Sequence, residues 1–373
     1  MKIAVFHNFL DNIGGAEMVD LLLARWFEAD IYTTNIDAEK IKKMGFADVL
    51  PRIYSIGKVP TNAPWKQELS YWQFRFLNVE KRFKRHYDFY IIAGDWAMAG
   101  ALHNQPNFWY VYSPTREIWD LYEYTRSHGV PKHLRWFFDL WVLLRRVINK
   151  HDAAKIKKIV AISKNTSQRV KKYLGRDAGV IYPPVDTAAF QYKQNGDFWL
   201  SVNRLITHKR VDLQIEAFRK MPQEKLVIIG SYEQSQHFRR YADYIQSIKP
   251  NNVEIRHWVS TDALKDLYAN CRGFITTAKD EDFGITPIEA MAAGKPVIAP
   301  NEGGYQETVV SGQHGILIDD INIDKIITAV KKISQNPKQY QEACFEQAKK
   351  FTTDVFIKKI SNLITTTVNE RHS

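Results

Sequence analysis

Short apolar runs alternate with amphipathic segments of helical period along most of the chain, which predicts a strand–helix repeat. The first series of predicted strands is Lys2–Phe6, Asp30–Thr33, Arg52–Ser55, Asp88–Ala93, Asn107–Tyr112, Lys158–Ile162 and Gly179–Tyr182. The second series is Phe198–Val202, Leu226–Ile229, Val253–Arg256, Phe274–Thr276, a strand opening at Pro296, and Gly315–Ile318. Such a repeat predicts the α/β class, with parallel sheets joined by right-handed crossovers.

A break in this pattern divides the chain into two predicted domains. Pro183-Pro184-Val185-Asp186 interrupts regular structure, and the polar stretch Gln191–Asp197 follows it. A length of 373 residues suits two domains of ordinary size. We expect Rossmann-like domains at 1–190 and 191–352, and terminal helices at 338–350 and 353–368.

Two predicted helices of the first domain combine aromatic and basic residues. In Lys66–His86 the spacing predicts a buried stripe of Leu69, Trp72, Phe76, Val79 and Phe83. The opposite face, either solvated or in contact with an anionic membrane, carries Tyr71, Phe74, Arg75, Lys81, Arg82 and Arg85. The very apolar helix Pro131–Asn149 contains too many charges to span a bilayer. It either packs in the core alone or also presents an interfacial side to a membrane.

The composition limits the kinds of partner and the cellular compartment that are consistent with the sequence. A net charge of +11 indicates a polyanionic partner such as nucleic acid, anionic lipid or a pyrophosphate-bearing substrate. The sequence has no nucleic-acid-binding motif, so we expect no nucleic acid. Two distant cysteines, Cys271 and Cys344, favour a reducing compartment. The N-terminus resembles a strand rather than a signal peptide, and no apolar run is long enough to span a membrane. We expect a cytoplasmic protein, with possible peripheral attachment to the membrane.

The stretch from Phe274 to Val297 carries the most specific chemistry. A short strand leads into the acidic loop Lys279–Gly284, and a helix is predicted to begin at Thr286-Pro287. Free backbone N–H groups at that helix start would lie at a strand's carboxyl end, where anionic ligands bind in open α/β sheets. Glu281 and Glu289 flank the loop. Local sequence alone allows Glu289 to be part of a capping box and Glu281 to be a solvated charge.

The residues from Glu281 to Val297 resemble the Glu-x7-Glu signature of retaining glycosyltransferases of family 4, which have the GT-B fold. The likeness continues from Glu302 to Val309. It implies two Rossmann-like domains facing each other across a cleft, with the C-terminal helix crossing back to the first. It places Glu281 beside the donor sugar and Glu289 on the nucleotide ribose. The expected donor-binding backbone comprises Phe283, Gly284, Ile285 and Thr286.

Other donor contacts are expected after the strands. Arg204 and Lys209 follow Phe198–Val202, where paired cations suit a diphosphate, and the family resemblance assigns them to the donor phosphates. Three glycines at strand ends permit close approach of a phosphate or sugar: Gly14, Gly15 and Gly230. A simple glycine turn is the alternative for Gly14-Gly15. The family resemblance also places the base near Trp258-Val259-Ser260, so Val259 is an expected donor contact.

The segment Tyr110–Asp120 resembles the mannosyltransferase-like branch of this family, whose motif is Tyr-x-His-Thr-Pro-x-Arg followed by Trp-Asp. Tyr112 stands in the place of the histidine. A phenol donates a hydrogen bond but does not carry the positive charge of an imidazolium. We therefore expect a positioning role for Tyr112, and we expect Arg116 and Asp95 to contact the acceptor.

Together these features predict a retaining, metal-independent transferase without a cofactor, for which GDP-mannose is the preferred donor. The acceptor-binding first domain would receive a glycan or lipid-linked glycan. A GT-A enzyme with a metal at Asp280-Glu281-Asp282 is a first rival, although it has one main sheet. A catalytically silent sugar-nucleotide-binding or scaffold protein is a second. A nicotinamide oxidoreductase lacks the necessary dinucleotide fingerprint.

Overall fold

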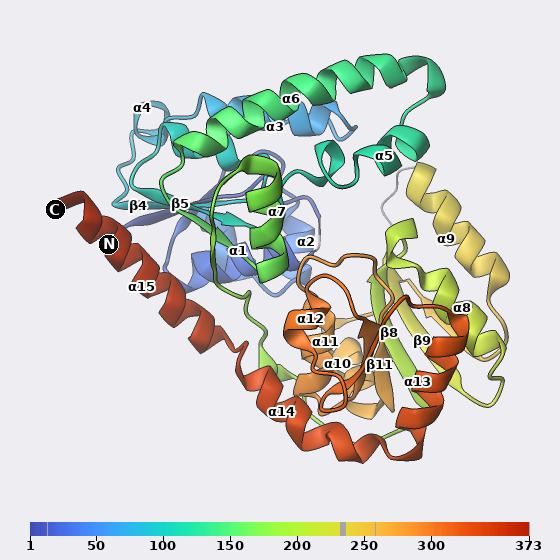
Figure 1. The fold of residues 1–373 in the computed structure, drawn as a ribbon. Helices are drawn as coiled ribbons and strands as arrows, with labels where there is room; N and C mark the ends of the chain where they lie inside the picture. The colour runs from blue at the N-terminus through green and yellow to red at the C-terminus, as the bar shows by residue number, and fades with distance from the viewer. Residues whose placement is uncertain (13, 232–235, 258, 373) are drawn as a thin grey trace. The chain divides into compact units, whose positions relative to one another are not determined.

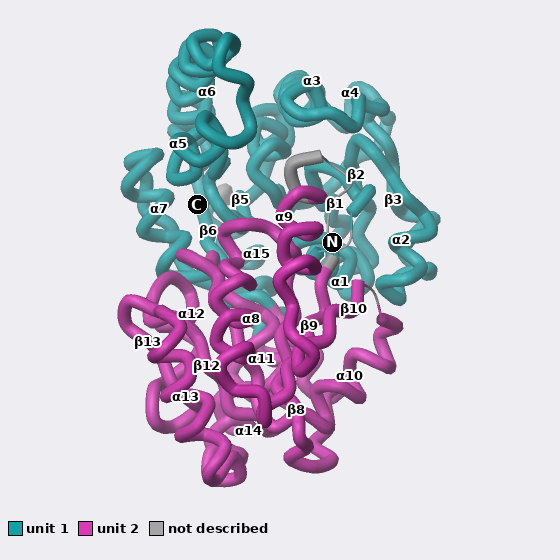
Figure 2. Tube along the Cα trace, turned by 90° about the vertical axis from the view of Figure 1, so that its right-hand side faces the viewer, with its two compact units in different colours: residues 1–183, 356–373 teal, residues 184–355 magenta. Residues whose placement is uncertain are grey.

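The chain folds into two compact units, each built around one parallel sheet (Figure 1). This computed structural model describes residues 1–12, 14–231, 236–257 and 259–372. Met1–Pro183 and Phe356–Ser373 form unit 1, and Pro184–Val355 forms unit 2 (Figure 2). The first unit therefore ends at Pro183 rather than at 190, because Val185 already pairs with Thr352 of unit 2.

The described part of unit 1 contains a seven-stranded parallel sheet in the order β3-β2-β1-β4-β5-β6-β7. Its strands are β1 Ile3–Phe6, β2 Asp30–Thr33, β3 Ile53–Ser55, β4 Phe89–Ala93, β5 Asn107–Val111, β6 Ile159–Ala161 and β7 Gly179–Val180. Its α-helices are α1 Gly15–Trp26, α2 Ala38–Lys43, α3 Trp65–Arg75, α4 Val79–Phe83, α5 Tyr122–Tyr124, α6 Arg135–Lys155 and α7 Lys164–Leu174. Apolar and aromatic side chains such as Phe6, Trp109 and Phe74 are fully buried around this sheet.

The prediction of one helix over Lys66–His86 was wrong in extent, and its orientation was wrong for α3, whereas Val79 of α4 is buried as predicted. The segment divides into α3 and α4, and α3 buries Tyr71 and Phe74 while Leu69 is 40% exposed and Phe76 is 73% exposed. The tyrosine hydroxyl donates to the buried Asp152 carboxylate of α6, and the Arg145 guanidinium lies 3.7 Å from the Tyr71 ring centre. Polar partners on α6, far away in sequence, thus decide which aromatic face of α3 is buried.

The described part of unit 2 contains a six-stranded parallel sheet in the order β10-β9-β8-β11-β12-β13. Its strands are β8 Phe198–Arg204, β9 Lys225–Ser231, β10 Val253–Arg256, β11 Gly273–Ile275, β12 Val297–Pro300 and β13 Gly315–Ile318. Its α-helices are α8 Val211–Arg219, α9 Gln236–Ile248, α10 Thr261–Asn270, α11 Ile285–Ala292, α12 Tyr305–Thr308, α13 Ile323–Gln335 and α14 Gln341–Lys349. Cys271 and Cys344 are buried in this unit and form no disulfide.

The last helix, α15 Thr353–His372, returns the chain to unit 1 from Phe356 onward. The rings of Phe356 and Tyr110 lie 5.9 Å apart, and Lys158 forms an ion pair with Glu370 at 2.8 Å. The crossing of the terminal helix onto the first unit, expected from the family resemblance, is therefore present. Within the part of the chain that the structure describes, no helix has the length and apolar character needed to cross a bilayer.

The contacts of Asp152 predict a large effect on stability. Its side chain is fully buried and accepts hydrogen bonds from Tyr71 and Arg75. The substitution Asp152→Ala leaves both donors without their acceptor, so we expect the free energy of unfolding in urea to fall by about 3 kcal/mol. Lys155→Ala, on the exposed side of the same helix, is the control and should change it by less than about 0.5 kcal/mol. Equal effects of the two substitutions would contradict this account.

Candidate functional site

The order of strands reverses beside the first strand of each unit. In unit 1 the chain moves outward from β1 to β2 and then crosses to β4, and in unit 2 it moves from β8 to β9 and later crosses to β11. The loops after β1 and β4, and those after β8 and β11, therefore leave the sheet in opposite directions. Such a reversal opens a crevice at the carboxyl ends of the strands, where open α/β sheets bind ligands. Most of the expected site residues lie at these two places.

In unit 2 the reversal brings Lys209 and Glu281 together. Lys209 lies in a 3-10 helix after β8, Glu281 lies in the loop after β11, and their side chains form an ion pair. The Lys209 side chain is 13% exposed and that of Glu281 is 21% exposed, so the pair is largely sheltered from water. Arg204 ends β8 and is exposed. The sequence-predicted cations and the first glutamate thus share one edge of the sheet.

The backbone of the Glu281 loop is held by the glycine pair Gly303-Gly304. The Gly304 N–H donates to the Glu281 carbonyl oxygen at 2.8 Å. A Cβ on Gly303 would lie 2.6 Å from the same oxygen, and the φ angle of this glycine is +61°. A larger residue at 303 would displace the loop, so the two glycines fix the position of Glu281.

Helix α11 begins beside this loop without a side-chain cap. It starts at Ile285, and its N-cap residue is Gly284, whose φ angle is +88°. The expected start at Thr286-Pro287 was therefore wrong by about one residue, and Thr286 lies in the first turn. A Cβ on Gly284 would lie 2.7 Å from the Tyr305 ring, so the turn requires glycine. N–H groups at a helix start that no side chain caps can bind an anion.

Glu289, one turn further along α11, contacts a residue that the sequence did not indicate. Its carboxylate accepts a hydrogen bond from the Tyr268 hydroxyl at 2.7 Å. Glu289 therefore bonds to α10 instead of closing a capping box at the start of its own helix. Burial raises the pKa of the Glu289 carboxyl, and the Tyr268 hydrogen bond opposes this shift. Tyr268 was missed because its only signal is a tyrosine on an amphipathic helix.

A second ion pair lies close to the same loop. Arg210 is paired with Glu302, and its Nε donates to the Thr277 carbonyl oxygen just after β11. These contacts join the end of β8, the end of β11 and the Gly303-Gly304 turn. Arg210 directly follows Lys209, and Glu302 begins the stretch that continues the family resemblance, but the sequence gave no indication that these two residues form an ion pair.

Two of three further expected donor contacts in unit 2 have clear packing roles. Gly230 makes room for Leu205, since a Cβ there would lie 2.6 Å from that side chain. Phe283 is buried against Phe351, with ring centres 5.6 Å apart. Val259 is half-buried before α10, whereas the neighbouring Trp258 lies outside the described residues. Packing accounts for Gly230 and Phe283, and their roles toward a donor stay predictions.

In unit 1 the reversal is bridged by Asn8 and Asp95. The Asn8 side-chain amide donates to the Asp95 carboxylate at 2.9 Å, and its oxygen accepts from the backbone N–H groups of Trp96 and Ala97. Burial raises the pKa of Asp95. Burial and then the Asp95 carboxylate raise the pKa of Glu117 to about 7. Asp95 thus has a second carboxyl group as a neighbour, and the sequence did not indicate Glu117.

Tyr112 is bound to α1. Its hydroxyl donates to Asp20 at 2.6 Å and contacts the Ala16 carbonyl oxygen at 3.2 Å. Burial, followed by the Asp20 charge, raises the pKa of this phenol well above 10.0, so it stays protonated near neutrality. The second Asp20 oxygen lies 2.5 Å from His7 Nδ1. Burial lowers the pKa of His7, but the neighbouring carboxylates, Asp20 first and then Glu17 and Asp95, together outweigh burial and the net shift is upward.

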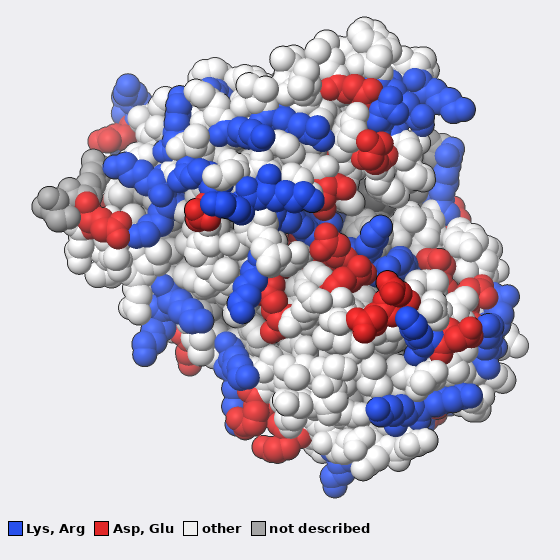
Figure 3. Space-filling model, viewed as in Figure 1, with Lys and Arg blue, Asp and Glu red and all other residues white. Residues whose placement is uncertain are grey.

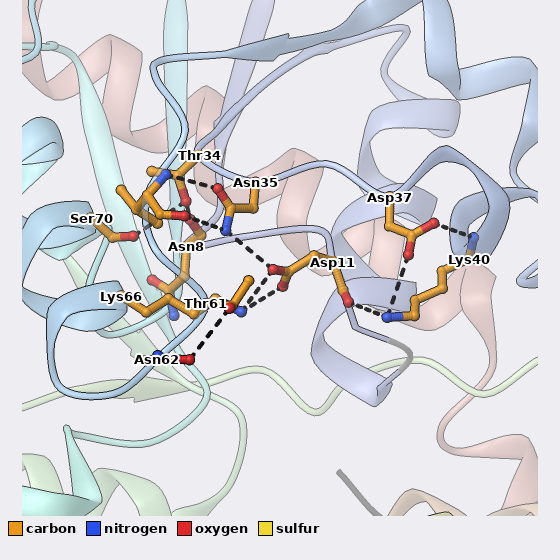
Figure 4. Close-up of polar contacts among 11 residues, drawn as sticks. Asn8, Asp11, Thr34, Asn35, Asp37, Lys40, Thr61, Asn62, Lys66 and Ser70 are labelled. Carbon is orange, nitrogen blue, oxygen red and sulfur yellow. Dashed lines mark hydrogen bonds and ion pairs between the residues drawn. The ribbon is translucent and has the colours of Figure 1, made fainter. Parts of the chain in front are cut away.

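The loop that precedes Gly14-Gly15 is held by a polar network (Figure 4). Asp11 forms an ion pair with Lys66 at 2.7 Å, and its carbonyl oxygen accepts from Lys40 at 2.7 Å. Gly14 is the extended N-cap of α1, and a Cβ on it would lie 2.5 Å from the Glu17 carboxylate. Gly14 therefore lies in the turn that opens α1, and its role toward a ligand stays a prediction.

Arg116, the other expected acceptor contact, forms an ion pair with Asp120 at 2.7 Å and is 16% exposed. Arg116 therefore lies in the segment that follows Tyr112, and the Asp120 carboxylate balances its positive charge.

Comparison with known proteins shows what the second unit is similar to. Residues 186–351 match the family model of glycosyl transferases group 1. The match covers most of unit 2 and no part of unit 1. The chain is 32% identical over 195 residues to alpha-1,3/1,6-mannosyltransferase ALG2 of Saccharomyces cerevisiae, which covers 40% of the chain and 39% of that protein. It is 27% identical over 225 residues to the GDP-mannose-dependent alpha-(1-6)-phosphatidylinositol monomannoside mannosyltransferase of Mycolicibacterium smegmatis, covering 52% of the chain and 56% of that protein.

These matches span about two-fifths to just over half of the relatives' length. Solved structures establish the fold over almost the whole chain. Anabaena Alr3699/HepE, solved with UDP and glucose, is similar with a TM-score of 0.77 at 16% identity, over 98% of this chain and 100% of that one. Sucrose-phosphate synthase from Thermosynechococcus elongatus gives 0.76 at 15% identity, over 98% of each chain. The predicted GT-B fold with two Rossmann-like domains is confirmed.

The Tyr268 contact predicts a change in the titration of Glu289. The substitution Tyr268→Phe keeps the ring and removes the hydrogen bond that lowers the pKa of this carboxyl, so we expect its pKa to rise further above 4.5. Carbon-13 NMR of labelled glutamate carboxyl groups measures this shift. The matched control is Tyr241→Phe, which removes a hydroxyl bonded to Asp212 instead and should leave Glu289 unchanged. A Glu289 pKa that does not move in Tyr268→Phe would exclude this hydrogen bond.

The His7–Asp20 contact predicts a pH dependence of stability. Because the pKa of His7 is raised in the folded state, its stabilisation is complete below 6.5 and is lost as the pH rises through the raised value. Asp20→Asn removes the stabilising charge, so the melting temperature should fall most at low pH and the difference from the unmodified protein should shrink above pH 6.5. Asp177→Asn, an exposed carboxylate paired with Lys171, is the control. A difference between Asp20→Asn and the unmodified protein that grows with pH would refute the assignment.

Proposed function

We propose that the chain is a retaining glycosyltransferase that moves a sugar from a nucleotide-diphosphate sugar to a glycan or lipid-linked glycan. The observation that carries the proposal is the group at the strand reversal of unit 2. There Lys209 contacts Glu281 beside the uncapped start of α11, and Glu289 lies on the same helix. The match of residues 186–351 to the family model of glycosyl transferases group 1 supports it.

In this proposal the donor diphosphate binds at the start of α11. Negative charge develops on the leaving diphosphate during transfer, and Arg204, Lys209 and the α11 N–H groups stabilise it. Such a set of cations and backbone donors does this without a metal ion, so we propose metal-independent transfer with no cofactor. The loop carboxylate Glu281, which also orients Lys209, positions the sugar. Glu289 accepts hydrogen bonds from the ribose.

Retention needs the acceptor to attack from the face that the leaving group occupies. We propose that a donor phosphate oxygen takes the acceptor proton on that face. Tyr112 does not act as the base, since its phenol stays protonated and is bound to Asp20. Its role is to position the segment that carries Arg116, which with Asp95 contacts the acceptor. An inverted product would exclude this route.

GDP-mannose is the proposed donor. Its support is the likeness to a GDP-mannose-dependent mannosyltransferase and to alpha-1,3/1,6-mannosyltransferase ALG2, together with the Tyr110–Asp120 motif. The former relative acts on a phosphatidylinositol monomannoside, which favours a lipid-linked acceptor. A role at the cytoplasmic face of a membrane, in polysaccharide or glycoconjugate synthesis, follows from such an acceptor.

One observation favours a catalytically silent relative as the second candidate. Tyr112 stands where the mannosyltransferase-like motif has a histidine, and its hydroxyl is already bonded to Asp20. A silent relative would bind the donor but transfer no sugar.

Nucleotide binding is the first test. We expect calorimetry to detect GDP binding in the presence of a chelator, with UDP, ADP and CDP binding more weakly. Glu289→Ala removes the charged acceptor for the ribose and should weaken GDP binding about tenfold to a hundredfold. Glu342→Ala, an exposed carboxylate on α14 of the same unit, is the control and should not change the affinity.

The outcomes separate the candidates. Binding of none of the nucleotides would overturn the proposed function. GDP binding without transfer of mannose to any glycan acceptor would select the silent relative. Where transfer occurs, Lys209→Ala should lower kcat about a hundredfold or more, because it removes a cation that stabilises the leaving diphosphate.

A further inference from the structure

Helix α6 of unit 1 exposes a continuous apolar stripe over about three turns. The side chains recur at helical spacing and are between 49% and 69% exposed: Trp136, Phe137, Leu140, Leu143, Leu144 and Val147. A helix of a globular protein ordinarily turns its apolar stripe toward the core. The opposite side of α6 faces the core although it is partly polar, because Val142, Arg145 and Asn149 are buried there. The outer stripe therefore has no partner in the described part of unit 1.

Helix α3 adds a second exposed stripe. Trp65 is 63%, Leu69 40% and Phe76 73% exposed, and Trp72 is half-buried between them. Their spacing of four, three and four residues places them on one side of the helix. This is the side that the sequence predicted to be buried.

The two helices are fixed to one another. Glu68 of α3 forms an ion pair with the buried Arg145 at 3.1 Å and accepts from the Trp141 indole at 3.0 Å. Further along, Tyr71 and Arg75 of α3 bind Asp152 of α6. These successive contacts hold α3 parallel to α6 at the same end of unit 1 (Figures 1 and 2). We call the exposed stripes of the two helices together the α3–α6 face.

The charges around this face are positive. Residues 65–76 and 132–155 contain eight lysines and arginines and three carboxylates. Each carboxylate forms an ion pair with an arginine: Glu68 with Arg145, Asp139 with Arg126, and Asp152 with Arg75. Exposed lysines lie before and after the α6 stripe, at Lys132, Lys150 and Lys155. Figure 3 shows a largely uncharged surface along the edge of unit 1 that α6 forms, with basic side chains next to it.

We propose that the α3–α6 face docks unit 1 peripherally onto a bilayer containing anionic lipid. An amphipathic helix with apolar and tryptophan side chains on one face and lysines at its borders lies in the membrane interface. The apolar side chains enter the boundary between headgroups and acyl chains, and the lysines meet the negative headgroups. Exposed apolar patches of this extent are rare on proteins without a partner.

The exposed lysines favour a bilayer over a second copy of the chain as the occupant. Lysine is depleted in protein–protein interfaces, and two copies would bring the same exposed lysines together. An anionic lipid surface supplies the opposite charge over the whole border of the face. The α3–α6 face lies outside the donor site of unit 2, so this inference does not rest on the proposed function.

Flotation with lipid vesicles tests the proposal on the full chain. We expect binding to vesicles of phosphatidylcholine with phosphatidylglycerol, and much weaker binding to phosphatidylcholine alone. Trp136→Gln should lower the partition coefficient about tenfold. Its matched control is Trp26→Gln, on α1 of the same unit, where the tryptophan is 53% exposed and lies outside the face. The control should bind as the unmodified protein does.

A second pair of variants tests the charge. Lys150→Gln should weaken binding to the anionic vesicles about fivefold, whereas Lys331→Gln, an exposed lysine of α13 in unit 2, should not. An unchanged melting temperature shows that each variant folds.

The proposal is overturned if the unmodified protein does not float with anionic vesicles, or if Trp136→Gln binds as well as Trp26→Gln. A dimer in analytical ultracentrifugation that Trp136→Gln dissociates, without vesicle binding, would assign the face to a second copy. Since no nucleotide is present, failure here leaves the proposed function standing.

Discussion

The reversal of strand order beside β1 and beside β8 is the constraint on which both candidate sites depend. A parallel sheet places every loop that follows a strand at one edge, and the reversal makes two of these loops diverge. In unit 2 the diverging loops carry Lys209 and Glu281, and in unit 1 they carry Asn8 and Asp95. A polar contact joins the two loops in each unit. The same topology thus brings together residues from widely separated positions in both halves of the chain.

The Lys209–Glu281 ion pair is the feature of this edge on which the proposed binding of a charged ligand depends. Both side chains are largely sheltered from water, where an unpaired charge would be costly. The carboxylate orients the lysine side chain before any ligand arrives. A diphosphate that binds at the start of α11 would share this lysine with Glu281. The glycine pair 303–304 contributes by fixing the backbone of the Glu281 loop, so little reorganisation is needed.

The sequence predicted the strands and the edge at which the site lies because both depend on local patterns. Apolar runs followed by glycine or charged residues marked β1, β8 and β11, and the motif around Glu281 marked the loop. The pairing of Glu289 with Tyr268 and of Tyr112 with Asp20 could not be predicted in the same way. Each joins a side chain to a helix of another repeat, and hydrophobic periodicity contains no information on such polar contacts. The predicted start of α11 was wrong for a related reason. The turn at Gly284 packs on Tyr305, which is distant in the sequence, and the local pattern contains no information on that contact.

Helix α3 shows why amphipathic pattern alone does not decide which side is buried. It has apolar or aromatic residues on two sides, so the period predicts a stripe without choosing between them. The side with Tyr71 is buried because Asp152 and Arg145 of α6 satisfy its hydroxyl and stack on its ring. Leu69 and Phe76 offer no comparable polar contact and face outward. A helix with two apolar sides can bury one side in the protein core and the other side in a second apolar environment. The core of unit 1 supplies one of them, and the bilayer that we propose for the α3–α6 face supplies the other.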